Sequence, residues 1–295
     1  MRHLYIVVTG SIVLLVGFCV SAIAGDGEST ITGYFEGDAV LGEFTYKNSA
    51  DGKGLVISYY SPSINKVLTY NVAKYDECSA MSMYRMRNTR QVVVDGSCSS
   101  QGGQIYKYVY EWSGARKNWC LVREITGERE DIYLGAVVSS ERVFRVKNCA
   151  ILGADEPYSY ESDTEVARDI AAEIKKFRGS VSSKEMLRRY LDSLPSYSIS
   201  EMAWYINSDN VRDINDLAFY LSKNGRSYDV LPLLEKIVRE FPERTVAKLN
   251  LADAYWDGDF KERGALFYRK YYEDMVSRKL EKKVPNRVLD RMKKY

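Results

Sequence analysis

The sequence predicts an α+β fold, in which a disulfide-bonded antiparallel β-domain precedes an α-helical domain. Residues 25–152 contain short runs rich in β-branched and aromatic residues, separated by Gly, Asn, Asp and Ser. From residue 163 to residue 295 the apolar residues instead recur three and four positions apart, which is the period of a helix buried on one face. Residues 153–162 lie between the two patterns and are expected to form a linker.

Residues 1–24 have the composition of a secretory signal peptide. Arg2 precedes an apolar run from Leu4 to Val20, and Ala22-Ile23-Ala24 supplies the small residues of a cleavage site. A membrane anchor is the alternative, but the run is short for a span and is not followed by Lys or Arg. We therefore expect a periplasmic protein that begins at Gly25 and has no membrane span after cleavage.

The β-domain is expected to contain about seven closely spaced strands. They are predicted at residues 31–35, 39–46, 55–60, 67–72, 91–94, 104–112 and 119–125. Their spacing, without helical periodicity in between, indicates an antiparallel sheet, a sandwich or a partial barrel. In the sixth run, Tyr106, Tyr108 and Tyr110 share one face. They could form a platform for carbohydrate or peptide, although a half-buried sheet face is the favoured interpretation.

Four cysteines remain once Cys19 is removed with the signal peptide. They are Cys78, Cys98, Cys120 and Cys149. An even number of cysteines in an exported chain predicts two disulfides, with three connectivities open. A thiol catalyst or a zinc site is less favoured, because the sequence has no C-x-x-C pair.

Three pairs of Ser and Glu, each spaced as a capping box, mark helix starts in the C-terminal half. The pairs are Ser162 with Glu165, Ser182 with Glu185, and Ser198 with Glu201. Each precedes an apolar stripe, so the sequence predicts a helix after each pair. These helices, and the segment 284–292, are expected to cap the two ends of the repeat described next.

The chain contains an internal repeat of 34 residues, with copies at about 211–244 and 245–278. The shift sets the Leu-Ala-x-x-Leu of 217–221 on the Leu-Ala-x-x-Tyr of 251–255. Each copy has two apolar runs at helical spacing with a Gly between them, which predicts two amphipathic helices joined by a tight turn.

This period, these apolar cores and Phe241-Pro242 at the end of the first copy resemble a tetratricopeptide repeat. Ile214 and Lys248 replace the early Trp of the family pattern. The resemblance covers about 65 residues. It implies a module of stacked helix pairs that binds other proteins, whereas the β-domain resembles no family.

In such arrays the first helices of successive pairs line a concave binding face. The candidate protein-binding residues, chosen by helical phase, are Asn215, Phe219, Lys223, Asp253 and Trp256. Phe219 and Trp256 are the strongest candidates, because aromatic residues anchor many interfaces. Packing of these two rings against neighbouring helices or the β-domain is the alternative.

The composition excludes several kinds of enzyme. His3 is the single histidine and is removed with the signal peptide, so the mature chain has no histidine base, triad or metal ligand. Ser63-x-x-Lys66 and Ser208-Asp209-Asn210 match two motifs of penicillin-binding enzymes, but the third motif, K-T-G, is absent. Ser63 also lies in a predicted turn. No catalytic, cofactor-binding or metal-binding residue is predicted.

Paired carboxylates are the acid–base device that remains, as in glycoside hydrolases. Asp95, Glu111 and Glu124 lie on or beside predicted strands, and no pair among them stands out. Without Arg2 the chain has one more basic than acidic residue and no long run of either sign. Nucleic acid is therefore not a predicted partner.

These observations favour a non-catalytic, protein-binding protein of the periplasm over an enzyme. One role is that of an immunity or inhibitor protein against a toxin that acts in the periplasm. Another is that of a scaffold or assembly factor for a cell-envelope complex. A carboxylate-dependent glycan hydrolase is the enzymatic alternative. The sequence does not decide between the first two roles, and the enzyme is the least favoured of the three.

Overall fold

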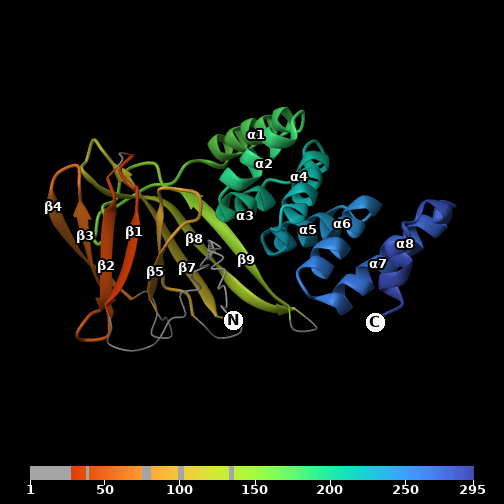
Figure 1. Cartoon of the computed structure of the whole chain (residues 1–295), viewed down its shortest axis with the longest axis horizontal. Coiled ribbons are helices and arrows are strands. Elements are labelled where there is room, and N and C mark those ends of the chain that lie inside the picture. The colour runs from red at the N-terminus through yellow and green to blue at the C-terminus, as the bar shows by residue number, and fades with distance from the viewer. Residues whose placement is uncertain (1–27, 38–39, 75–80, 99–102, 133–135) are drawn as a thin grey trace, which may run out of the picture.

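The computed structural model describes residues 28–37, 40–74, 81–98, 103–132 and 136–295, and in it strands precede helices (Figure 1). The predicted α+β class is therefore confirmed. The expected signal peptide, residues 1–24, and Cys78 lie outside the described residues.

The first sheet is an antiparallel meander. Its strands are β1 (Ser29–Gly33), β2 (Gly42–Asn48), β3 (Gly54–Ser61) and β4 (Lys66–Ala73). Inward-facing residues such as Phe44 and Ile57 are buried and alternate with more exposed ones. Ser63 lies in the turn between β3 and β4, as predicted, and not at the start of a helix.

The second sheet has five antiparallel strands in sequence order. They are β5 (Ser82–Arg85), β6 (Val92–Asp95), β7 (Gln104–Ser113), β8 (Asn118–Ile132) and β9 (Ala136–Arg145). The sequence pattern predicts neither β5 nor β9. The first has four residues, and in the second Ser139-Ser140-Glu141 interrupts the apolar pattern.

The two sheets pack face to face (Figure 1), and many of the side chains between them are aromatic. The ring of Trp119 lies 4.8 Å from that of Phe44 and 5.2 Å from that of Tyr59, as measured between centroids. Tyr108 and Tyr110 are buried in the same core. The sheet face that carries Tyr106, Tyr108 and Tyr110 thus packs in the core, in agreement with the favoured interpretation. The alternative, a platform for carbohydrate or peptide, was wrong.

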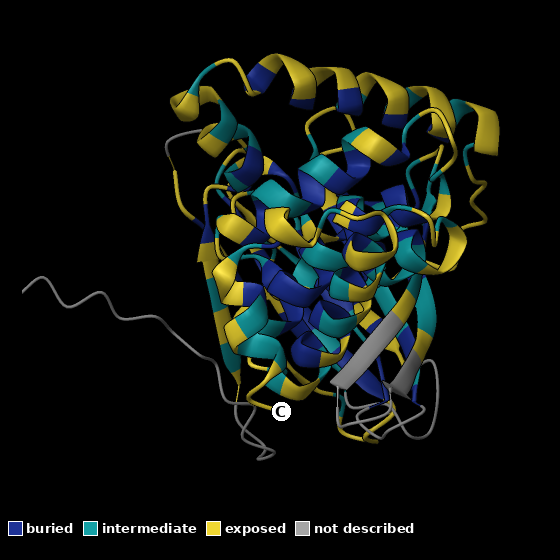
Figure 2. Cartoon of the chain, turned by 90° about the vertical axis from the view of Figure 1, so that its right-hand side faces the viewer, coloured by how far each residue is buried: buried dark blue, intermediate teal, exposed yellow. Residues whose placement is uncertain are grey.

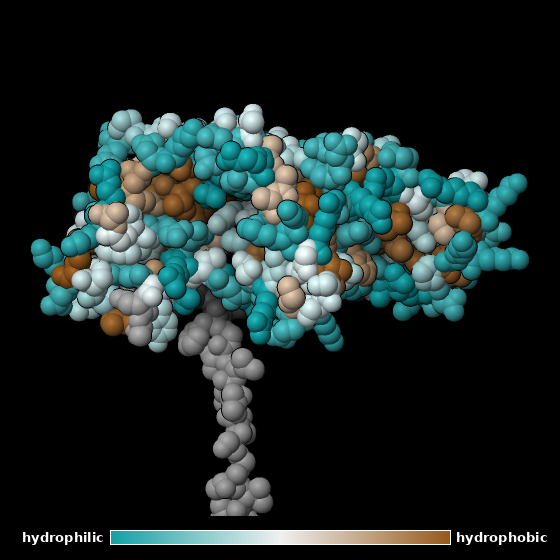
Figure 3. All heavy atoms as spheres, turned by 90° about the horizontal axis from the view of Figure 1, so that it is seen from above, coloured by the Kyte–Doolittle hydropathy of each residue, from teal (hydrophilic) through white to brown (hydrophobic). Residues whose placement is uncertain are grey.

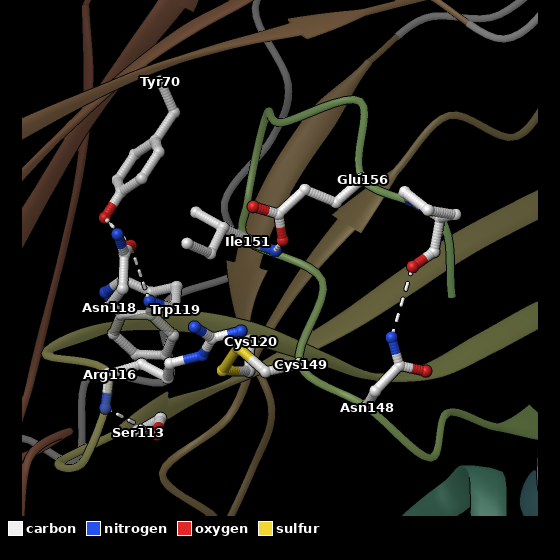
Figure 4. Close-up of a disulfide and its surroundings, with 11 residues drawn as sticks. Tyr70, Ser113, Arg116, Asn118, Trp119, Cys120, Asn148, Cys149, Ile151 and Glu156 are labelled. Atoms are coloured by element: carbon white, nitrogen blue, oxygen red, sulfur yellow. Dashed lines mark hydrogen bonds between the residues drawn. A yellow bond between two sulfur atoms is a disulfide. The ribbon is translucent and has the colours of Figure 1, made fainter. Parts of the chain in front are cut away.

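A disulfide joins Cys120 of β8 to Cys149, which follows β9. Cys98 is disulfide-bonded as well. Figure 4 shows that the chain after Cys149 folds back on itself: the Ile151 amide donates to Glu156, and the Asn148 side chain donates to the Pro157 carbonyl. The disulfide therefore anchors the start of the expected linker to the sheet.

Residues 158–161, in the second half of the expected linker, pair with the end of β9. The Lys147 amide donates to the Ser159 carbonyl at 2.8 Å, and the Glu161 amide donates to the Arg145 carbonyl at 2.9 Å. Tyr160 forms a β-bridge with Val146. This segment thus extends the second sheet and holds its side chains against β9.

Eight α-helices and a short 3-10 helix follow in the described chain. They are α1 (Asp163–Ser180), α2 (Lys184–Ser193), α3 (Ser196–Trp204), α4 (Val211–Lys223), α5 (Ser227–Glu240), α6 (Thr245–Asp257), α7 (Lys261–Ser277), η1 (Glu281–Lys283) and α8 (Asn286–Met292). The starts of α4 and α6 are 34 residues apart, as are those of α5 and α7. Buried residues of all four helices join one hydrophobic core, and Figure 2 shows buried segments in dark blue inside a largely exposed outer layer.

The capping boxes had three different outcomes. Ser162 and Glu165 form the predicted box at the start of α1. The cap of α2 is Ser183 and not Ser182. The third box was wrong, because Ser198 and Glu201 lie inside α3. Pro195 precedes α3, and its fixed φ lets the helix begin earlier than the Ser-x-x-Glu spacing indicates.

Candidate functional site

The predicted residues of α4 lie beside α6. Asn215 is buried, and its side-chain oxygen accepts a hydrogen bond from Asn250 of α6 at 3.2 Å. Phe219 is half-buried, and the ammonium group of Lys223 lies 5.9 Å from its ring centroid. Asn215 therefore serves the contact between helices, while Lys223 is exposed at the edge of that contact.

Asp253 of α6 lies at the centre of a charged cluster and is 2% exposed. Its carboxylate accepts hydrogen bonds from Tyr268 at 2.6 Å, from Arg287 at 2.9 Å and from Arg291 at 3.4 Å. The ammonium group of Lys223 lies 3.8 Å away. We call these five residues the Asp253 cluster. Burial and the neighbouring carboxylate raise the pKa of Tyr268 further above neutral pH, which favours its hydroxyl as a donor to Asp253.

Helix α8 closes this part of the helical domain. It supplies both arginines of the Asp253 cluster, and the guanidinium of Arg291 also lies 4.8 Å from the ring centroid of Trp256. Lys261 and Tyr295 contact the same ring, at 5.2 and 6.0 Å. Trp256 is thus half-buried beneath charged and aromatic neighbours from its own chain.

A second group of aromatic residues lies where the domains meet, and it is open to solvent. The guanidinium of Arg142 lies 5.5 Å from the ring centroid of Trp204 and 4.9 Å from that of Phe144. The Phe144 ring lies 5.1 Å from Tyr160, which lies 5.7 Å from Tyr158. We call these five residues the aromatic strip. Three elements distant in sequence, β9, residues 158–160 and α3, build it.

Backbone geometry explains how the strip forms. Arg142 and Phe144 share a face of β9, because side chains alternate along a strand. Phe144 lies directly across from Glu124 of β8, and the hydroxyls of Tyr158 and Tyr160 both donate to that carboxylate. Burial and Glu124 raise the pKa of both tyrosines further above neutral pH, which favours the protonated hydroxyls as donors to this carboxylate.

Trp204 is 47% exposed, and Tyr158 and Tyr160 are 36% and 41% exposed. The indole N–H of Trp204 donates to the Glu141 carbonyl at 2.6 Å, and Lys236 lies 4.8 Å from the ring centroid. The indole is therefore held in place while much of it faces solvent. Arg142 forms no ion pair with any residue that the structure describes.

Beneath the strip, α3 packs onto the second sheet. Tyr197 joins a small core of Val93, Val109, Ile125 and Val143. Nearby, Arg145 of β9 makes a bidentate contact with the buried carboxylate of Glu201, at 2.7 and 2.8 Å. This contact raises the pKa of Arg145. The two domains are thus joined by apolar packing and a buried ion pair.

The carboxylates considered for acid–base chemistry are separated. Glu111 accepts from Gln91 on the side of the sheet that α3 covers, whereas Glu124 lies on the opposite side. Asp95 accepts a hydrogen bond from the amide of Ser97. Within the described part of the chain there is no group of three or more metal-ligating side chains and no helix able to cross a membrane.

Comparison with protein-family models, curated proteins and solved structures finds no match for this chain. The function of the chain must therefore be inferred from its own surface. Viewed from above, hydrophobic residues form small separate patches among hydrophilic ones (Figure 3). Bulk hydrophobicity does not single out a binding face in that view, so the local chemistry of the aromatic strip is the better guide.

The sequence pattern does not predict the strip. Tyr158-Ser159-Tyr160 falls in the expected linker, although its alternating aromatic residues are typical of a strand. Trp204 ends the α3 helix and is not among the predicted binding residues. The pairing of residues 158–161 with β9, which brings these aromatic residues together, leaves no signal in the local pattern.

Proposed function

We propose that this protein is a non-catalytic binding protein that holds another protein on the aromatic strip. The observation that carries the proposal is the composition of the strip. Trp, Tyr and Arg dominate the energies of protein interfaces, and here all three lie side by side and exposed. The polar groups of Trp204, Tyr158 and Tyr160 already have partners within the chain, so burying the strip leaves few donors unpaired.

Arg142 gives the proposed partner its chemistry. Its guanidinium lies between two aromatic rings and lacks a carboxylate among the described residues. An acidic side chain of the partner would complete this arrangement with a charge-assisted hydrogen bond. We therefore infer a partner segment that carries an Asp or Glu next to apolar residues.

Rigid docking of the two domains favours tight binding. The Arg145–Glu201 pair and the Tyr197 core fix the elements that carry the strip, so little conformational entropy is lost when a partner binds. A preorganised surface of this kind suits an inhibitor or immunity protein that neutralises one periplasmic target. The tetratricopeptide-like helices would then brace the strip through α5, which contacts both β9 and α3.

Site-specific photocrosslinking tests the proposal. A benzophenone side chain replaces Tyr158, in the strip, or Tyr228, an aromatic residue of α5 that is 63% exposed. Crosslinks are then formed in cells of the native host. We expect one specific protein adduct at position 158 that Trp204→Ala suppresses, and no such adduct at position 228. The same adducts at both positions, or an adduct that Trp204→Ala leaves unchanged, would contradict the proposal.

A further inference from the structure

A polar pocket of about 440 Å³ lies between the second sheet and helices α1 and α3. Its charged lining consists of Arg123 of β8, Arg145 of β9, Asp169, Glu173 and Lys176 of α1, and Glu201 of α3. Pockets at the junction of domains are frequent sites for small ligands. This one is separate from the aromatic strip, because Arg123 and Arg145 point to the face of the sheet that α3 covers.

The lining contains an unusual cross-strand pair. Arg123 and Arg145 lie directly opposite each other in the β8–β9 register and line the same pocket. Two like charges at such positions repel and destabilise a sheet unless counter-charges are supplied. Arg145 has three carboxylates for this purpose, on Glu161, Asp169 and Glu201.

Arg123 has no such counter-charge. In the described part of the chain it forms no ion pair; it donates to the carbonyl of Val122 at 2.7 Å, and its guanidinium lies 5.6 Å from the ring centroid of Tyr197. The Nε atom of Arg123 is buried without an acceptor. The other charges of the lining are satisfied, since Lys176 contacts Glu173 at 2.9 Å and Asp169 contacts Arg145 at 2.8 Å.

We propose that this pocket binds a small molecule through an oxyanion, a carboxylate or a phosphate, held by the guanidinium of Arg123. The anion would give Arg123 the direct partner that it lacks in the described part of the chain, and the planar guanidinium suits either group as a bidentate donor. Asp169 and Glu173 can accept hydrogen bonds from hydroxyl or ammonium groups elsewhere on the same ligand.

Calorimetric titration with two probes tests this site. Inorganic phosphate and succinate are added separately to the purified protein at matched ionic strength. We expect saturable binding of at least one probe, and the probe that binds identifies the group. Arg123→Gln should weaken this binding about tenfold or more, because it removes a charge-assisted hydrogen bond. Arg116→Gln, in the exposed turn between β7 and β8, should leave it unchanged.

A thermal melt of each variant without the probes provides the control for folding. Arg123→Gln relieves the like-charge pair, so it should melt no lower than the unmodified protein. Saturable binding that is equal in Arg123→Gln and the unmodified protein would overturn the proposal. So would the absence of saturable binding of both probes to a protein that melts cooperatively.

Discussion

The Asp253 cluster with Trp256 and the aromatic strip are built from the same kinds of residue, yet they differ in what they leave open. In the first, the cations turn inward to a carboxylate that is 2% exposed, and α8 covers the site. In the second, Trp204 is 47% exposed and Arg142 has no carboxylate among the described residues. A cluster that the chain itself covers is structural, whereas a surface of similar composition that stays open to solvent can bind a partner.

The largest effect on stability is expected at Arg145, which joins β9 to α3 next to the aromatic strip. Arg145→Met leaves the buried carboxylate of Glu201 without its bidentate partner. We expect the free energy of unfolding to fall by about 3–5 kcal/mol, measured by urea denaturation. Adding Glu201→Leu should restore part of this loss, because the uncompensated charge is then gone. A fall below about 1 kcal/mol in the single variant would show that the pair does not hold the domains together.

The next largest effect on stability is expected in the Asp253 cluster. Asp253→Asn keeps the side-chain volume but removes the charge that Arg287 and Arg291 share. The free energy of unfolding should fall by about 2–3 kcal/mol. Partner affinity should not change, since this site is filled by the chain. Weaker partner binding without loss of stability would instead make the cluster part of the interface.

The aromatic strip should show the opposite result, a loss of partner affinity with little loss of stability. Arg142→Gln should weaken partner binding by about tenfold or more, because the partner loses a charge-assisted contact. Its effect on the free energy of unfolding should stay within about 1 kcal/mol, as Arg142 is exposed. Arg116→Gln is the matched control for the loss of one surface charge. Equal affinities of the two variants would remove Arg142 from the interface.

The smallest effect is expected at Glu165 of α1, which helps to anchor the segment that carries Tyr158 and Tyr160. Hydrogen bonds from the Ser162 backbone amide, and then from Lys147 and the Ser162 hydroxyl, lower the pKa of Glu165 to about 2, from an ordinary value of 4.5. The stabilisation is therefore present above pH 4.5 and is lost as the pH falls towards about 2. Glu165→Gln should melt below the unmodified protein at neutral pH, and the difference should disappear in acid. A difference in melting temperature that is independent of pH would rule out this carboxylate as its cause.

Local patterns predicted the elements better than the site. The 34-residue period anticipated the spacing of α4 with α6, and alternation located most strands, because both depend on neighbours in sequence. Helical phase also placed Asp253 and Trp256 on α6, but it could not show that Arg291 of α8 would cover them. Glu201 was assigned to a cap, and its actual partner, Arg145, lies 56 residues away. Such contacts depend on how domains dock, which no local pattern encodes.

The affinity of the crosslinked partner for two tryptophan variants tests the central claim most directly. Trp204→Ala removes the exposed ring of the strip, and Trp256→Ala removes the covered ring of the helical domain. We predict that Trp204→Ala weakens binding by about 30-fold or more, with little loss of stability. Trp256→Ala should lower the melting temperature and leave the affinity unchanged. Loss of affinity with Trp256→Ala, together with full affinity in Trp204→Ala, would contradict the account and place the interface on the helical repeats.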